Sequence, residues 1–365
     1  MPMLRRALIT LAICLFGAFG GFLASFTPLP LPWLLGSLLS CAALAVGAPF
    51  LLPIGYDFPQ GFRILFIATI GLLIGSQVSP EMFSDPTSFI FSLTAIIAFV
   101  PLAFAVNYII FRRIGGFDSV TAYYSAAPGG LIESIAMGET EGADLRRLVT
   151  QQFLRIIAVL ALVPFGLSLW EGHPVGSAAG VGISRSADPT NWPLYLCALA
   201  IGITAGKVLR LPAGQLTGAL LVSGALSLWG IPVVIPWWLV SISQVVVGAS
   251  LGIRFAGLSR SMLAQGLWLS LLSVAAMMSL GAVLALILIP LTGQGFEVLL
   301  ITFAPGGVNE MALIALSLDA NPAFVTLHHV FRIIVTVLAL SVMKRWLIKP
   351  GANTDPDTPS DATKL

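Results

Sequence analysis

The chain has 365 residues, of which 57% are hydrophobic and 9% charged, and its formal net charge is +2 at pH 7. Soluble domains carry about 25% charged residues, so this composition excludes an ordinary soluble protein. The near-neutral charge provides no basic surface for direct nucleic-acid binding. Apolar stretches long enough to cross a bilayer recur along nearly the whole chain. The composition therefore predicts an all-α polytopic membrane protein whose first partner is the lipid bilayer.

The apolar elements form two sets of six. Those of the first half are 7–26, 31–52, 62–79, 88–111, 119–139 and 147–169, and those of the second are 192–209, 213–231, 237–255, 263–290, 298–318 and 323–347. Two basic residues precede the first stretch, as in a signal peptide, but its internal counterpart in the second half favours a retained span. We therefore expect a membrane repeat over 7–170, a linker over 171–191, a second repeat over 192–347, and a disordered tail over 350–365.

A duplicated motif relates the two halves. Ala-Pro-Gly-Gly occupies 127–130 and again 304–307, which is 177 positions later (304 − 127). A glutamate and then an Arg-Ile-Ile follow both copies at the same offsets. A Gly-xxx-Gly pair at 71 and 75 recurs at 248 and 252, with the spacing of closely packed membrane helices. The chain is therefore a tandem repeat.

Positive charges decide whether the motif elements 119–139 and 298–318 cross the bilayer or turn back, because Lys and Arg gather on the cytoplasmic side. Leaving out Arg155 and Arg332 within spans, 16 of the 18 Lys and Arg remain (18 − 2). If the motif elements turn back, all of these except Arg185 lie on one side; if they cross, the division is 10 to 6. The charges favour inverted repeats with ten spanning helices, two re-entrant hairpins entering from opposite faces, and both termini in the cytoplasm.

Proline and paired glycines interrupt a helix, and an interrupted helix in a membrane is tolerated only in contact with protein or a cavity. The helix that restarts after each break presents free N–H groups and a partial positive charge, which suit an anion. Corresponding broken helices in two repeats are also a pointer to a transporter site. The predicted solute- and ion-binding residues are Pro128, Gly129, Gly130, Glu133, Arg155, Pro305, Gly306, Gly307, Asn309, Glu310, His329 and Arg332.

Two interpretations stay open for the charged residues of this set. Glu133 and Glu310 either cap their own helices or hold a proton or cation. Arg155 and Arg332 lie near the middle of spanning helices, where each either pairs with the glutamate of its own half or binds a carboxylate or phosphate of a solute.

The halves differ at several site positions. Asn309 adds a hydrogen-bonding side chain where the first half has Ile132, and His328-His329 stands where the first half has Gln151-Gln152. Histidine titrates near physiological pH, so these residues either couple transport to protons or only bond neighbouring helices. The differences indicate that the second half holds the more specialised part of the site.

The segments 126–133 and 303–310, the Arg-Ile-Ile that follows each, and the paired Leu-Pro segments resemble the AbrB-type bacterial membrane protein family. The resemblance implies two copies of a membrane repeat. The labels given to this family are regulation of gene expression and ammonia monooxygenase. Oxidation at copper or iron needs a cluster of ligands, whereas the histidines here are His173 in the linker and an adjacent pair in a helix. We therefore expect no enzyme activity and no cofactor.

The leading hypothesis is an ion-coupled secondary transporter in the bacterial inner membrane, with a small anionic solute and H⁺ or Na⁺ as its partners. The alternative is a membrane protein that affects gene expression indirectly, through a soluble partner. Assembly into a homo-oligomer stays open.

Overall fold

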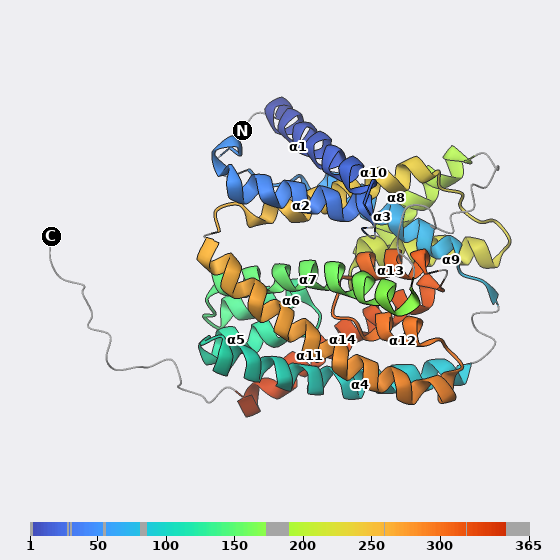
Figure 1. Cartoon of the computed structure of the whole chain (residues 1–365). Coiled ribbons are helices and arrows are strands. Elements are labelled where there is room, and N and C mark those ends of the chain that lie inside the picture. Colours follow the sequence, from blue (N-terminus) through green and yellow to red (C-terminus); the bar gives the residue numbers. More distant parts are fainter. Residues whose placement is uncertain are drawn as a thin grey trace.

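The computed structural model of the chain (Figure 1) describes residues 3–27, 29, 31–53, 56–80, 86–172, 190–258, 260–318 and 320–347. These residues form helices joined by turns and loops, without a strand. The longer helices are α1 (Met3–Ala24), α2 (Pro32–Gly47), α3 (Gln60–Ser76), α4 (Pro86–Ile109), α7 (Leu145–Glu171), α8 (Trp192–Val208), α9 (Gly214–Leu228), α10 (Trp237–Gly252), α11 (Arg260–Thr292) and α14 (Pro322–Leu347). The motif elements are pairs of short helices, α5 (Ser119–Ala126) with α6 (Leu131–Thr140) and α12 (Phe296–Phe303) with α13 (Val308–Ser317).

The apolar helices confirm an all-α polytopic membrane protein. Six are long and apolar enough to cross a bilayer, and they contain Leu4–Ala24, Pro86–Ile114, Leu145–Leu169, Trp237–Phe255, Ser261–Thr292 and Pro322–Lys344. Four shorter apolar helices are Pro32–Gly47, Gln60–Ser76, Trp192–Val208 and Gly214–Leu228. These ten helices (6 + 4) lie at the positions of the ten predicted spans. The predicted element 88–111 is longer in the structure, because α4 starts at Pro86 and a π-helical turn extends it to Ile114.

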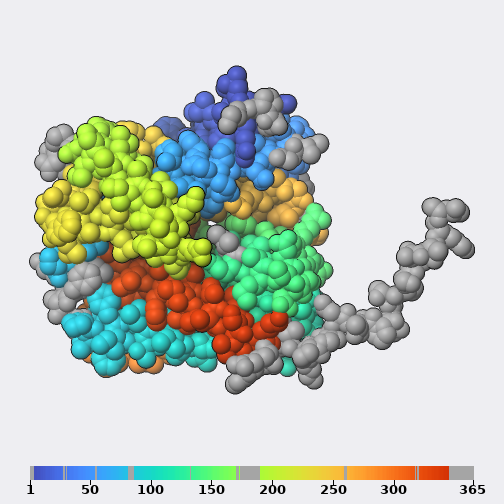
Figure 2. All heavy atoms as spheres, turned by 180° about the vertical axis from the view of Figure 1, so that it is seen from behind, coloured from blue at the N-terminus to red at the C-terminus, as the bar shows by residue number. Residues whose placement is uncertain are grey.

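The helices pack in two layers that each draw on both halves of the sequence. The first layer consists of α1–α3 and α8–α10, held by the pairs α3 with α9 and α2 with α10 (Figure 1). The second layer consists of α4–α7 and α11–α14, held mainly by α11 against α7 and α4, and α14 against α4 and α13. The same division is visible from behind, with the blue and lime helices of the first layer above the cyan and red helices of the second (Figure 2). All four motif helices therefore lie in one layer.

Glycines allow the closest contacts within the first layer, as their spacing predicts. A Cβ at Gly71 or Gly75 of α3 would come within 3.0 Å of a backbone carbonyl oxygen of α9. A Cβ at Gly248 or Gly252 of α10 would do the same against α2. The two helix pairs are thus equivalent in the two repeats, and each depends on the absence of side chains where the backbones meet.

The first motif element turns back, as the charge distribution predicts. The backbone N–H of Asp144, just after α6, donates to Thr121 Oγ1 at the start of α5 over 2.8 Å. Between them, Gly138 of α6 lies against the side chain of Tyr124 of α5. The chain therefore leaves this hairpin beside the point where it entered.

The two hairpins enter the second layer from opposite ends. The first turns of α14 meet the first turns of α4, where His328 Nε2 and Ser92 Oγ are 2.7 Å apart. At the other end of α4, Gln265 near the start of α11 donates to the carbonyl oxygen of Gly115 over 3.3 Å, and the start of α7 bonds to the loop before α11. Helices α7 and α14, which follow the hairpins, therefore begin at opposite ends of α4. In Figure 1 the hairpins α5–α6 and α12–α13 likewise lie toward opposite ends of α4.

Several predicted features fall outside the described residues. The predicted linker lies between α7, which ends at Glu171, and α8, which begins at Trp192. Residues 173–189, which include His173 and Arg185, and the predicted tail 350–365 are not among the described residues.

Candidate functional site

Arg155 is buried in the middle of α7, with 3% of its surface exposed, and holds the end of α5. Its Nη1 donates to the carbonyl oxygens of Ala127 at 2.7 Å and Ser125 at 3.4 Å, and its Nη2 donates to Gln152 Oε1 at 2.6 Å. The last carbonyls of a helix have no partner within that helix. The guanidinium therefore supplies the hydrogen bonds that α5 lacks where Pro128 ends it.

Arg332 has the same role in the second half, 177 residues later (332 − 155), and is 1% exposed. Its Nη1 donates to the carbonyl oxygens of Ala304 and, at 3.5 Å, Phe303, and its Nη2 donates to Gly306 at 2.9 Å. Both arginines are thus bound to the broken backbone of the hairpin of their own half.

The residue three positions before each arginine makes an equivalent hydrogen bond in the two repeats, although the residue type differs. Gln152 Nε2 donates to the carbonyl oxygen of Tyr124 over 3.0 Å, and His329 Nε2 lies 3.0 Å from that of Ile301. The accepting residues are themselves 177 apart (301 − 124). The structure therefore keeps this hydrogen bond in both repeats while the chemistry of the donor changes.

The preceding pair, Gln151 and His328, joins neighbouring spans in the same way. Gln151 Nε2 donates to Ser270 Oγ of α11 over 2.7 Å. His328 Nε2 lies 2.7 Å from Ser92 Oγ of α4, and its Nδ1 lies 2.7 Å from the carbonyl oxygen of Phe324. For these two residues the structure shows the helix-to-helix bonding that was one of the two predicted roles.

The proposed pairing of each arginine with the glutamate of its own half is wrong. In the part of the chain that the structure describes, no ion pair involves Arg155 or Arg332. In place of the glutamates, the arginines bond backbone carbonyls and, for Arg155, the amide oxygen of Gln152, all of which carry only partial charges. The Nε atoms of both arginines are buried without a hydrogen-bond partner, and the two positive charges lie close enough to act on each other.

The two glutamates differ in their surroundings. Glu310 is 5% exposed in the first turn of α13, and its carboxylate folds back against Gly307, just before that helix. It also interacts electrostatically with Arg63 of α3, in the first layer. Glu133 is half-buried, beside Gly130.

The helix breaks lie where the motif predicts them. Helix α6 starts after Gly130, whose φ of +62° is in the left-handed region that glycine tolerates. Helix α13 starts after Gly307, whose backbone is extended, with φ −72° and ψ 152°. Asn309 is half-buried in the first turn of α13, while the side chain of its counterpart Ile132 is not among those described.

Gly129 brings the first hairpin against the second half. A Cβ at this position would lie 3.6 Å from Arg332 Nε and 3.4 Å from Thr336 Oγ1, both on α14. The space in front of the unpartnered Arg332 Nε is therefore bounded by the break of the other repeat. The site combines residues of both halves. The sequence could not show this, because a repeated motif does not indicate which helix it packs against.

A group of polar atoms in the first half is buried without a hydrogen-bond partner, namely Tyr124 Oη, Ser125 Oγ, Ser134 Oγ and Gln151 Oε1. The sequence singles out Gln151 as the counterpart of His328. For the tyrosine and the two serines, their place in short apolar helices is the only signal in the sequence. Among the described residues, no three His, Cys, Asp or Glu side chains are grouped so that they could hold a metal ion.

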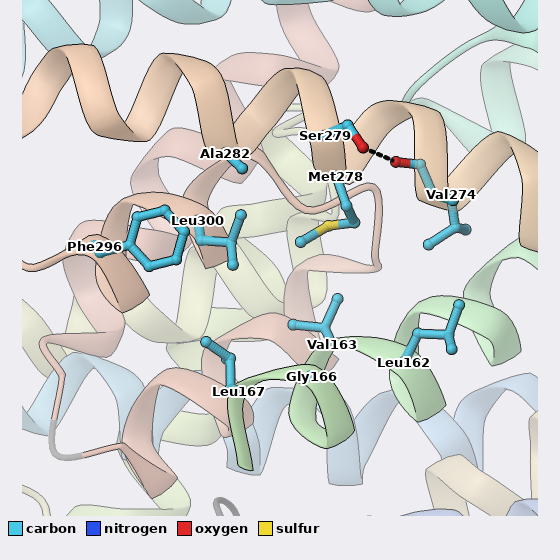
Figure 3. Close-up of a pocket in the computed structure, with 11 residues that line it drawn as sticks. Leu162, Val163, Gly166, Leu167, Val274, Met278, Ser279, Ala282, Phe296 and Leu300 are labelled. Carbon is cyan, nitrogen blue, oxygen red and sulfur yellow. Dashed lines mark hydrogen bonds between the residues drawn. The ribbon is translucent and has the colours of Figure 1, made fainter. Parts of the chain in front are cut away.

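Two cavities lie along α7, one on each side of Arg155. The first, of about 280 Å³, is at the start of the helix, and Arg146, Arg147, Thr150 and Gln151 form part of its wall. The second, of about 360 Å³, lies between α7, α11 and α12 and is almost entirely apolar (Figure 3). In Figure 3 Leu167 and Val163 of α7 face Leu300 of α12 across it. The walls thus change from polar to apolar on passing Arg155.

A family model described as "Transition state regulatory protein AbrB" matches residues 33–348. The chain belongs to this family. Any function that the AbrB label suggests for this chain must therefore be compatible with a membrane-spanning fold that contains paired helix breaks.

Two relatives match nearly the full length of the chain. One, from Bacillus subtilis (strain 168), is named "Uncharacterized protein YhjN" and is 29% identical over 355 residues, covering 90% of this chain and 91% of its own. Another, from Escherichia coli (strain K12), is named "Putative regulator AbrB" and is 23% identical over 352 residues, covering 95% and 97%. No solved structure matches the chain.

Proposed function

We propose that this AbrB-family protein is a secondary transporter that carries a small anionic solute across the bacterial inner membrane, coupled to H⁺ or Na⁺. Both termini then lie in the cytoplasm, as the positive charges predict. One observation carries the proposal: two buried arginines, one per repeat, that no described carboxylate neutralises and that each keep an unpartnered Nε–H.

Two uncompensated charges make this region a site for an anion. A buried charge without a partner costs several kcal/mol, and here Arg155 and Arg332 also repel each other. A bound carboxylate or phosphate relieves both costs, because it supplies negative charge and accepts the free N–H groups. Bonds to carbonyl oxygens hold the guanidiniums in place before the solute arrives.

The surrounding architecture supports transport rather than binding alone. Hairpins that enter from opposite ends give the site equivalent approaches from the two faces of the membrane. The cavities on either side of Arg155 lie along such approaches, one with polar walls and one with apolar walls. The AbrB label, by contrast, names no solute.

Flux measurements in proteoliposomes test the proposal. Vesicles with an imposed pH or Na⁺ gradient are assayed with radiolabelled small carboxylates and phosphate. We expect saturable uptake by the wild-type protein and at least about tenfold less uptake by Arg332→Lys, which keeps a charge but loses the planar fork. Arg332→Ala and Glu310→Gln abolish uptake while the protein is still produced. Wild-type flux in both of these variants contradicts the site assignment.

The family description and the name of the E. coli relative favour one other function, indirect regulation of gene expression. That function requires a soluble partner at the cytoplasmic face. A tight complex with a soluble regulator, together with no solute flux in the same vesicles, supports regulation over transport.

A further inference from the structure

His329 and Arg332 of α14 each have one nitrogen without a hydrogen-bond partner, in the imidazole ring and in the guanidinium group respectively. His329 is fully buried and Arg332 is 1% exposed. They are three positions apart and therefore share a helix face. Both side chains extend to the end of α12, where His329 bonds Ile301 and Arg332 bonds Ala304. His329 Nδ1 and Arg332 Nε are left without partners.

The hydrogen bond at the other ring nitrogen fixes the state of His329. A carbonyl oxygen only accepts, so His329 Nε2, at 3.0 Å from that of Ile301, carries a hydrogen. In the neutral ring, Nδ1 then has a lone pair and no hydrogen. The same face of α14 therefore carries a buried acceptor, His329 Nδ1, and a buried donor, Arg332 Nε–H.

We infer that His329 Nδ1 and Arg332 Nε together bind the carboxylate of the solute, with the coupling proton on His329 Nδ1. The inference rests on the proposed transport function and names its solute class and its coupling ion. With the proton on Nδ1, both nitrogens are donors, one for each oxygen of a carboxylate. No bond in the solute breaks, because the proton and the anion enter and leave together.

Because of the surrounding positive charges, binding of the proton and binding of the carboxylate depend on each other. The charges that act on the His329 ring are those of Arg332 and His328, on its own helix. A further positive charge in this buried position is costly unless a negative charge arrives with it. Conversely, a carboxylate facing the lone pair of Nδ1 is repelled until that nitrogen is protonated.

The other titratable or charged groups near α14 belong to the elements packed around it. They are Arg63 of α3, Tyr108 of α4, Tyr123 and Tyr124 of α5, Glu133 and Glu139 of α6, Glu141 just after α6, Glu297 of α12 and Glu310 of α13. Arg155 of α7 also acts on Arg332. Among the described residues, none of these groups bonds to His329, and Glu310 acts on Arg63.

The first repeat provides the matched substitution. Gln152 occupies the position of His329 and makes the same 3.0 Å bond to a carbonyl oxygen, but it cannot take a proton. His329→Gln therefore keeps the helix contact and removes the titratable nitrogen, and it adds an amide oxygen of the kind that accepts from Arg155 in the first repeat. His328→Gln is the control, because Gln151 occupies the equivalent position and both ring nitrogens of His328 already lie within hydrogen-bond distance of other atoms.

The experiment measures acetate binding to the purified full-length protein from the shift of its thermal midpoint, at constant Na⁺ and ionic strength, between pH 6 and 8. We expect the wild-type affinity for acetate to fall by up to about tenfold per pH unit, the limit for one bound proton. A pH indicator in weak buffer should report one proton taken up per acetate. His329→Gln should bind acetate more weakly and without pH dependence, and His328→Gln should behave like the wild type.

The outcomes separate this inference from the proposed function. Acetate binding by the wild type that is independent of pH, with no proton uptake, overturns the role of His329 but leaves an anion site at the arginines. If acetate binding by His329→Gln still depends on pH, the role of His329 is likewise overturned and the anion site remains. If neither acetate, nitrate nor phosphate stabilises the wild-type protein at any pH, the anion site itself is refuted. The wild-type proton count decides the question even if His329→Gln does not fold.

Discussion

At the scale of single residues, the centre of the molecule is held by arginines that bond to backbone. Arg155 and Arg332 satisfy the carbonyls freed by the helix breaks, with no carboxylate among their described partners. Such bonds fix a guanidinium without neutralising it. The residue that stabilises the break is therefore also the one that keeps a full positive charge for a ligand.

A methyl group at Gly129 should block the site without disturbing the fold. In Gly129→Ala the new Cβ would meet Thr336 Oγ1 at 3.4 Å, Arg332 Nε at 3.6 Å and Ile333 Cγ1 at 3.8 Å, which are ordinary contact distances. We expect a thermal midpoint close to that of the wild type and at least about tenfold weaker acetate binding, because the methyl fills the space in front of Arg332 Nε.

Gly47→Ala is the control for this experiment, because a Cβ there meets nothing within 4 Å. It should change neither stability nor binding. Acetate binding by Gly129→Ala with wild-type affinity would place the anion elsewhere.

The sequence predicted the breaks and the depth of the arginines but not their partners. Pro128 and the glycines that follow it specify an interrupted helix through local backbone geometry. Apart from Gln152, the partners of Arg155 are carbonyl oxygens, which every residue has, so no residue type marks them. Glu310, the expected partner of Arg332, instead interacts electrostatically with Arg63 of α3.

At the scale of elements, the two repeats are alike because the same residues set the same helix contacts. Glycines bring α3 against α9 and α10 against α2, and the spacing of four in the sequence was enough to predict close packing. The choice of partner helix was not predictable, since a small-residue face fits any helix that presents a complementary backbone.

The contact between α3 and α9 should be sensitive to a single methyl group. In Gly75→Ala the Cβ would come within 3.0 Å of backbone atoms of α9, so the helices must separate, at a cost of about 1–3 kcal/mol. Gly61→Ala, on the same helix, places its Cβ in open space. We expect a clearly lower thermal midpoint for Gly75→Ala alone. Equal midpoints for the two variants would show that α3 and α9 do not pack in this way.

At the scale of the whole molecule, packing regroups the two repeats into two layers. The first layer holds its helices by glycine contacts, and the second contains both hairpins and both arginines. Charged and polar contacts join the layers, among them Arg254 over the ring of Phe153, at 4.9 Å, and the interaction of Arg63 with Glu310. The distribution of positive charges predicted the inverted topology, whereas the layers depend on long-range packing between the halves.

The inverted topology predicts how single cysteines are labelled in a variant that lacks the native cysteines. Arg113→Cys, before α5, and Thr140→Cys, at the end of α6, should both react with an impermeant maleimide applied from the cytoplasmic side. Gly295→Cys, before α12, should react only from the opposite side. Labelling of positions 113 and 140 from different sides would mean that the first motif element crosses the membrane.

The most direct test of the anion site is crystallographic. Crystals of the wild-type protein soaked in sodium bromide, measured at the bromine absorption edge, locate a bound anion directly. We predict one anomalous peak inside the second layer, next to Arg332 Nε and between α14 and Gly129, which weakens when acetate competes. Bromide peaks confined to the protein surface, or no interior peak at saturating bromide, would contradict an anion site at the paired helix breaks.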